Sequence, residues 1–267
     1  MSTITIDIQK VLETKSPFLA KIPFFVSWLK KTVHEKEINE CLRVCGQYHG
    51  AEFATQVIKF FGAQVNVVHT FPLQADGRYI FAANHPLGGF DGIALLQAIS
   101  SMFLEIRFPV NDLLLAIENF QPIFMPINKL GIQNREAVKI INVAHESIDQ
   151  QILMFPAGLV SRKIKGEIVD LDWQKHFISK AMQYKRDIVP VYIDGRNSDR
   201  FYRLANWRKR LGIKANIEML YLPDEMFRQK NKTITITIGK PIPCTMLKNQ
   251  SPQEWADFVK FQTYALA

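Results

Sequence analysis

Five consecutive apolar residues, Tyr79–Ala83, lead directly into the polar segment 84–91, which has the sequence Asn-His-Pro-Leu-Gly-Gly-Phe-Asp. An uninterrupted apolar run of this length predicts a buried strand. A histidine, His85, therefore stands where the strand ends, and a carboxylate, Asp91, follows six residues later. The proline and the two glycines between them permit a sharp turn, which would bring the carboxylate back to the imidazole.

The rest of the chain alternates between short apolar runs and segments of helical periodicity. We expect strands at residues 64–71, 79–83, 106–108, 123–127, 151–155, 188–193, 216–221 and 233–238. We expect helices at residues 35–61, with a break near 46–50, and at residues 91–103, 134–150, 173–185, 199–210 and 252–264. Asp172 and the pair Asn197-Ser198 are the expected N-caps of the helices that follow them. Strands that alternate with helices favour an α/β fold, in which helices flank a largely parallel central sheet.

His85 and Asp91 together form a candidate catalytic pair. The charge of a histidine changes near neutral pH. A carboxylate bonded to one ring nitrogen fixes the tautomer and leaves the other nitrogen free to accept a proton. Such a pair can deprotonate a hydroxyl or an amine of the substrate, so no serine or cysteine nucleophile is required. The alternative is that Asp91 only caps the following helix and that His85 is an ordinary loop residue.

A second strand-to-loop segment has a related layout. The apolar run 152–155 continues into residues 156–163, which have the sequence Pro-Ala-Gly-Leu-Val-Ser-Arg-Lys. Backbone N–H groups around Gly158, together with Arg162 and Lys163, are suited to hold an anion or an oxyanion. Ser161 is expected to cap the loop or to contact substrate. A solvated basic turn is the alternative for the whole segment.

These segments, in this order, resemble those of the glycerolipid acyltransferases, the family that includes the lysophosphatidic acid acyltransferases. The matched residues of the first, third and fourth family blocks are Asn84, His85 and Asp91; Phe155, Pro156, Gly158 and Ser161; and the apolar run 188–192. The resemblance covers about residues 60–240, most of the chain. It is strongest to a branch often labelled hemolysins, which includes the ornithine-lipid and glycine-lipid N-acyltransferases of Bacteroidetes.

The chain departs from the family pattern at three points, and two of them concern the acceptor. Five residues, instead of the usual four, separate His85 from Asp91. Ala157 stands where the family has a glutamate. Asn128 stands where an arginine follows the second block, and the nearest arginine is Arg135. Because the family associates that glutamate and arginine with a glycerol phosphate acceptor, this acceptor is disfavoured here.

The resemblance implies an acyltransferase of bacterial lipid biosynthesis, which takes a fatty acyl group from a thioester of acyl carrier protein or coenzyme A. The expected acceptor is the amine of glycine or a related amino acid, with His85 as base and Asp91 orienting it. Two alternatives stay open: O-acylation of a lysolipid such as 1-acylglycerol 3-phosphate, and a non-catalytic, hemolysin-like membrane-binding protein. The expected substrate-binding residues are Asn84, Gly88, Gly89, Asn128, Arg135, Phe155, Pro156, Gly158, Ser161, Arg162 and Lys163.

The chain has a formal net charge of +8. This charge suits an acidic carrier protein or an anionic membrane surface, and in view of the site segments we expect no nucleic-acid partner. The three cysteines and the remaining histidines lack metal-ligand spacing, and no glycine motif for nucleotide binding is present, so we expect no metal and no bound cofactor. Residues 1–10 do not resemble a signal peptide, and no apolar run is long enough to cross a bilayer. The expected location is cytoplasmic, peripheral on the inner face of the cytoplasmic membrane.

Residues 16–31 combine aromatic and basic side chains. Rings that enter the headgroup region beside lysines that stay hydrated are typical of a membrane interface. The alternative is an arm that packs on the rest of the protein. We expect two parts, an N-terminal helical segment (residues 1–62) and an acyltransferase α/β domain (residues 63–267). A basic cluster with interleaved aromatic residues, 196–214, is expected to be either a membrane or carrier-protein surface or a solvated helix face.

Overall fold

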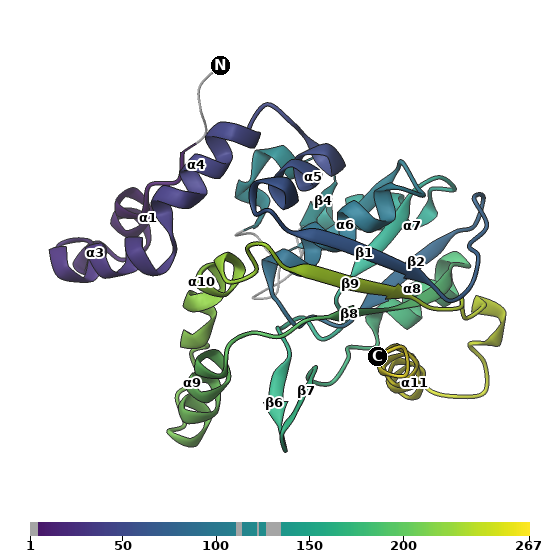
Figure 1. Ribbon diagram of the computed structural model, residues 1–267. Coiled ribbons are helices and arrows are strands. Elements are labelled where there is room, and N and C mark those ends of the chain that lie inside the picture. Colours follow the sequence, from purple (N-terminus) through teal and green to yellow (C-terminus); the bar gives the residue numbers. More distant parts are fainter. Residues whose placement is uncertain (1–4, 111–113, 122, 127–134) are drawn as a thin grey trace.

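The computed structural model describes residues 5–110, 114–121, 123–126 and 135–267. Its centre is a sheet with the strand order β1-β9-β8-β2-β5-β3-β4 (Figure 1). The strands are β1 (Gln64–His69), β2 (Tyr79–Ala83), β3 (Ile106–Val110), β4 (Phe124–Pro126), β5 (Gln151–Met154), β8 (Asp187–Asp194) and β9 (Thr233–Ile238). Neighbouring strands pair in parallel except β8 and β9, which are antiparallel. The predicted α/β fold with a largely parallel sheet is therefore confirmed.

Helices cover both faces of the sheet because the central strands are apolar on both sides. Phe81 and Ala83 of β2 face a core that includes α4 (Glu35–Cys45), α5 (Gly50–Phe60) and α6 (Gly89–Ser100). Ile80 and Ala82 face a second core. The helices of this second core are α7 (Arg135–Glu146), α8 (His176–Tyr184) and α11 (Pro252–Tyr264). The predicted break in the 35–61 helix is confirmed, since α4 ends at Cys45 and α5 begins at Gly50.

The first three helices form a projection at one end of the molecule (Figure 1). They are α1 (Ile8–Lys15), α2 (Pro17–Ala20) and α3 (Pro23–Thr32), and they share a small core made of Leu12, Ala20, Val26 and Leu29. His34 joins this end to the α/β body, because its Nε2 lies 3.0 Å from Asp224 Oδ1 and its ring stacks on Phe227. Within the described residues, none of the helices combines the length and the apolarity that crossing a bilayer requires.

Two expected elements are wrong. Residues 216–221 are not a strand: they form a 3₁₀ helix, η3 (Ile217–Tyr221), which continues into α10 (Leu222–Phe227). This segment packs on α9 (Asp199–Arg210) instead of on a sheet edge, because Glu218 turns inward to an ion cluster with arginines. Asp172 is not a helix cap either. The helix begins four residues later, since Trp173 is buried in the core and its indole donates to Asp170.

The sequence did not predict the antiparallel hairpin of β6 (Arg162–Ile164) and β7 (Glu167–Val169), which follows the second site segment. Its strands are too short for a periodic signal. Further short 3₁₀ helices are η1 (Leu114–Ala116), η2 (Glu118–Phe120) and η4 (Cys244–Met246). The expected cap of α9 is confirmed for Ser198, whose hydroxyl accepts the Phe201 N–H.

Candidate active site

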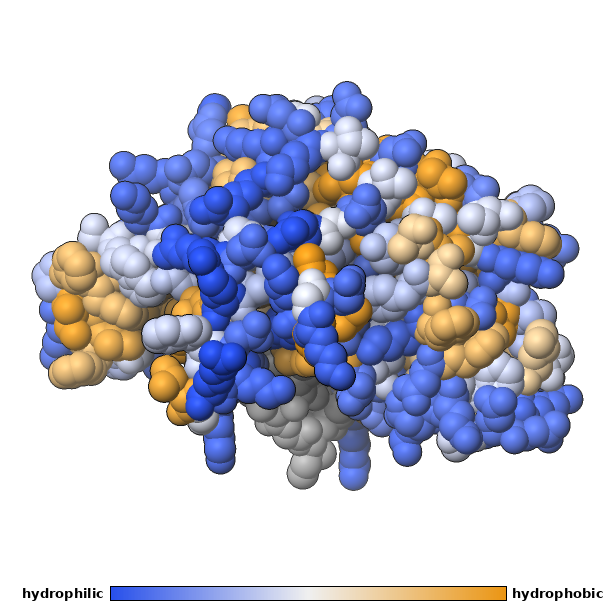
Figure 2. Space-filling model, turned by 60° about the horizontal axis from the view of Figure 1, so that its bottom comes forward, coloured by the Kyte–Doolittle hydropathy of each residue, from blue (hydrophilic) through white to orange (hydrophobic). Residues whose placement is uncertain are grey.

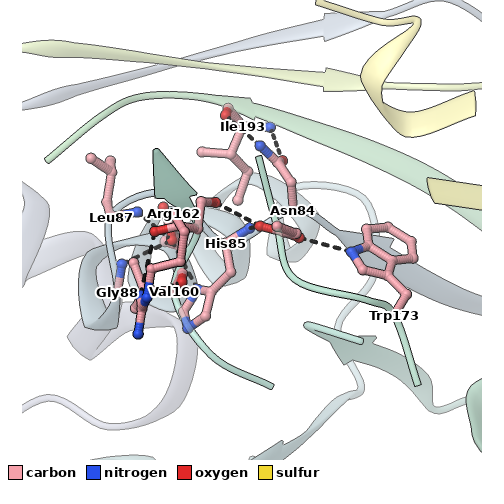
Figure 3. A network of polar contacts seen from close by, with 11 residues as sticks. Asn84, His85, Leu87, Gly88, Val160, Arg162, Trp173 and Ile193 are labelled. Atoms are coloured by element: carbon pink, nitrogen blue, oxygen red, sulfur yellow. Dashed lines mark hydrogen bonds and ion pairs between the residues drawn. The ribbon is translucent and has the colours of Figure 1, made fainter. Parts of the chain in front are cut away.

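The two site segments meet at the carboxyl ends of β2 and β5, next to the end of β8. Asn84 fixes the first of them. Its buried side-chain amide donates to the Ile193 carbonyl at 3.0 Å, and its oxygen accepts the Ile193 N–H at 2.6 Å (Figure 3). The amide thus continues the β2–β8 pairing by one step after the strand ends. The Asn84 side chain therefore fixes the end of β2, from which the His85 loop begins.

The His85 imidazole and the Asp91 carboxylate are in contact. His85 Nδ1 lies 2.9 Å from Asp91 Oδ2, and the same oxygen accepts the N–H groups of Leu87 at 2.7 Å and Gly88 at 3.0 Å. Asp91 is fully buried in the first turn of α6, so it both holds the loop and pairs with the histidine. Burial raises the pKa of Asp91 above its usual value, although these three bonds favour its charged form.

Gly88 makes this loop possible. Gly88 caps α6 with φ of +81°, a backbone conformation that residues other than glycine rarely adopt. A Cβ at this position would also lie only 3.1 Å from Leu222 of α10. Gly89 has open space around its own Cβ position, so only the first of the two glycines is required by the geometry.

Phe155 holds the His85 ring from one side. The two rings stack with centroids 4.1 Å apart and planes inclined by 12°, and Phe108 contacts Phe155 edge-on. Asp91 binds Nδ1, and no hydrogen-bond partner of Nε2 is present among the described residues. With the Nδ1–H directed to the carboxylate, Nε2 is the nitrogen that can accept a proton. The His85 side chain keeps 16 % of its surface exposed, which leaves this nitrogen within reach of a substrate.

The loop after β5 lies directly against His85. Gly158 has φ of +65° and closes a turn through its N–H to the Phe155 carbonyl at 3.0 Å. The Ser161 N–H donates to the His85 carbonyl at 2.8 Å, so the two segments with the family resemblance are bonded to each other. Pro156, also in this loop, accepts the Gln174 N–H. The two site segments, about 70 residues apart in the chain, are therefore adjacent in the structure.

The basic residues of this loop already have partners in the protein. Arg162 is buried; its Nη1 donates to the Val160 carbonyl at 2.6 Å and its Nη2 to Glu218 Oε1 at 2.9 Å. Burial lowers the pKa of Arg162, and the adjacent Glu218 opposes that shift. Lys163 pairs with Asp199 at 3.1 Å near the surface. A role for either residue in binding an anion stays a prediction.

The remaining expected site residues lie elsewhere or lack a description. Arg135 is the exposed first residue of α7, and among the described residues it forms no hydrogen bond or ion pair with the His85 or Gly158 loops. Asn128 lies outside the described residues. Ser161 is buried, and its hydroxyl donates to Asp170 Oδ1 at 2.6 Å. Sequence reasoning missed Asp170, since nothing in the local pattern separates it from Asp172, which is exposed.

The site thus places a His–Asp pair at a strand end, beside a glycine loop on a mostly parallel sheet. A model of the acyltransferase family matches residues 10–267, so this chain belongs to that family. A lyso-glycine lipid O-acyltransferase of Bacteroides thetaiotaomicron is 47 % identical, covering 99 % of this chain and 98 % of its own. A second protein of that name, from Phocaeicola vulgatus, is 45 % identical, with 99 % and 96 % covered.

The fold has a match among solved structures. The crystal structure of PlsC, the 1-acyl-sn-glycerophosphate acyltransferase of Thermotoga maritima, aligns with a TM-score of 0.50 and 15 % identity. The alignment covers 97 % of this chain and 94 % of the other. At this identity the match concerns the fold alone. The resemblance to glycerolipid acyltransferases is confirmed, and the protein is an acyltransferase.

Proposed function

We propose that this acyltransferase esterifies the hydroxyl of a lyso-glycine lipid with a fatty acyl group from an acyl carrier protein or coenzyme A thioester. The observation that carries the proposal is 47 % identity, along nearly the whole chain, to a relative with that activity in its name. The relatives favour a hydroxyl acceptor over the amine of glycine, which the sequence resemblance put first. Ala157, in place of the family's glutamate, continues to disfavour a glycerol phosphate acceptor. Membership of the acyltransferase family disfavours the non-catalytic, hemolysin-like alternative.

The chemistry of such an acceptor follows from its name. Glycine itself has no alcohol group, so we infer that the reacting hydroxyl belongs to the acyl chain that is already attached to it. Once the glycine amine is part of an amide it is no longer nucleophilic, and the hydroxyl is the group left to react. An alcohol is a weak nucleophile at neutral pH and gains most from a base placed next to it.

His85 and Asp91 supply that base. His85 Nε2 takes the hydroxyl proton while the oxygen attacks the thioester carbonyl, and Asp91 stabilises the imidazolium that forms. The intermediate collapses with cleavage of the C–S bond, and the thiolate takes the proton back from His85. The N–H groups of Leu159 and Val160 have no partner in the described part of the protein. Of these, the N–H of Leu159 is our candidate for holding the oxyanion, because Leu159 is partly exposed and lies two residues before Ser161, which is bonded to His85, whereas Val160 is fully buried.

The acceptor is tested by giving the purified protein one labelled acyl thioester and four acceptors. These are an N-acylglycine with a hydroxyl on its chain, the same molecule without the hydroxyl, free glycine, and 1-acylglycerol 3-phosphate. We expect an alkali-labile ester from the first acceptor only. An alkali-stable amide from glycine would restore the N-acylation hypothesis. Faster turnover of 1-acylglycerol 3-phosphate would assign the protein to phospholipid synthesis.

We also propose that the N-terminal helices contact the membrane that holds this acceptor. Hydrophobic side chains gather at the end of the molecule that carries these helices (Figure 2). One side of α2 and α3 faces the small core, while Phe18 and Phe24 on the other side are 76 % and 84 % exposed. Lys21, Lys30 and Lys31 accompany them. Exposed rings beside lysines suit the headgroup region of an anionic bilayer.

Replacing Phe18 and Phe24 together with alanine should weaken binding to vesicles of mixed zwitterionic and anionic lipids. Each ring that enters the interface contributes about 1.5–3 kcal/mol, so we expect a loss of at least about tenfold in affinity. Sedimentation with vesicles measures the effect. Phe261→Ala is the matched control, because Phe261 is 68 % exposed on α11. Equal losses in the two variants would show that α2 and α3 hold no special position at the membrane.

A further inference from the structure

Asp170 is a buried carboxylate that bonds to the main chain of His85. It follows β7 directly and is 2 % exposed. Its Oδ1 accepts the His85 N–H at 3.2 Å and the Ser161 hydroxyl at 2.6 Å, and its Oδ2 accepts the Trp173 indole N–H at 2.8 Å (Figure 3). No ion pair of this carboxylate occurs in the part of the chain that the structure describes. Burying a carboxylate that has only uncharged hydrogen-bond donors costs free energy of folding. A residue kept in such a place beside His85 is therefore a candidate for a role in the reaction.

The same segment binds the other side of the His85 peptide unit. The Ser161 N–H donates to the His85 carbonyl, so both backbone polar groups of His85 are bonded to residues 161–170. The ring is held separately, by Asp91 on Nδ1 and by Phe155 on its face. Two buried carboxylates therefore fix the histidine from different directions, one through its side chain and one through its backbone.

The C-terminal helix in turn holds Asp170. The Asp170 N–H donates to the Tyr264 hydroxyl at 2.7 Å, and its carbonyl accepts from Lys260 Nζ at 2.9 Å. Both partners lie on α11, which packs against β8 and α8. Burial raises the pKa of Tyr264, which keeps its hydroxyl neutral. The chain of contacts runs from α11 through Asp170 to His85.

We propose that Asp170 is a positioning residue for the reaction, and that it sets where His85 Nε2 stands relative to the attacking hydroxyl. The inference rests on the proposed role of His85 as base. Near-attack geometry is sensitive to displacements of about 1 Å, which can cost about 10²-fold in rate. Asp170 touches neither substrate nor reacting atoms in this account. Its effect passes through the backbone of His85.

The test is Asp170→Asn, assayed with the full chain and a hydroxyl-bearing N-acylglycine. Asparagine has the same shape but replaces one acceptor oxygen with an NH₂ group, which must face either the His85 N–H or the Trp173 indole N–H. In both orientations two N–H groups oppose each other, so the segment that holds His85 is displaced. We expect kcat to fall by about 10- to 100-fold, while KM for both substrates stays within about threefold. Asp172→Asn, two residues away at the surface, is the matched control and should retain wild-type kcat and KM.

If Asp170 had a purely structural role, its replacement would lower Tm without lowering kcat. Ile178→Val serves as a stability control, because Ile178 lies on the buried face of α8, away from the site, and valine is shorter by one methylene group. It should lower Tm by a few degrees and leave kcat unchanged. If Asp170→Asn lowers kcat no more than Ile178→Val at a similar loss of Tm, the positioning role is refuted. A rise in KM with unchanged kcat would refute it as well.

The outcome also separates this inference from the function on which it rests. An active His85→Ala protein would show that His85 is not the base, and the proposed mechanism would fail first. An inactive His85→Ala protein beside a fully active Asp170→Asn protein would refute the role of Asp170 alone.

Discussion

Acyl transfer by the His85→Ala protein should be lower than that of the wild type by about 10²- to 10⁴-fold, the range for loss of a general base. Among the described residues the ring makes one hydrogen bond and one stack at the edge of the core, so the chain should remain folded. Asp91→Asn should also be strongly impaired, because an amide does not hold the required tautomer or stabilise the imidazolium. Steady-state rates with a labelled acyl thioester measure both variants.

His69→Ala provides the control for the loss of an imidazole, since His69 is exposed at the end of β1. It should keep wild-type activity. Circular dichroism of all three variants separates loss of chemistry from loss of fold. Wild-type rates for a folded His85→Ala protein would disprove the assignment of the base.

Glu218→Gln should destabilise the protein by about 3–5 kcal/mol, the usual result of removing one partner from a buried ion pair. Glu218 is fully buried, with Arg162 Nη2 at 2.9 Å from one oxygen and Arg208 Nε at 2.8 Å from the other. Glutamine keeps the volume but leaves the two guanidinium groups facing each other without a counter-charge. Urea unfolding measures the change in free energy.

Glu40→Gln is the comparison, because Glu40 and Arg43 form an ion pair at the surface of α4. That variant should unfold at the same urea concentration as the wild type, since exposed ion pairs contribute little to stability. A loss of less than about 1 kcal/mol in Glu218→Gln would mean that water or a shift of the arginines compensates the buried cluster.

The parts of the site that the sequence predicted depend on residues close together in the chain. His85 and Asp91 are six positions apart, and the glycines between them allow only a few ways to connect a strand to a helix. The apolar runs before His85 and after Gln151 predicted β2 and β5 for the same local reason. Parallel pairing then brought the two loops together, as expected for neighbouring strand ends.

The parts that the sequence did not predict depend on partners far along the chain. Arg162 is bonded to Glu218, 56 residues later, in a segment whose alternating apolar residues resemble a strand. Asp170 and His85 are 85 residues apart. The local sequence does not indicate that Asp170 will be buried and that Asp172 will be exposed. Local patterns therefore predicted the His85–Asp91 contact, whereas the contacts from residues far along the chain became visible only in the tertiary structure.

Gly88 gives the unusual spacing of the His–Asp segment a structural meaning. The family pattern has four residues between the two, and this chain has five. In this longer loop Gly88 has φ of +81°, and a Cβ there would lie 3.1 Å from the Leu222 side chain. Because residues other than glycine rarely adopt a positive φ, a loop of this length depends on the glycine at position 88 to return Asp91 to the imidazole.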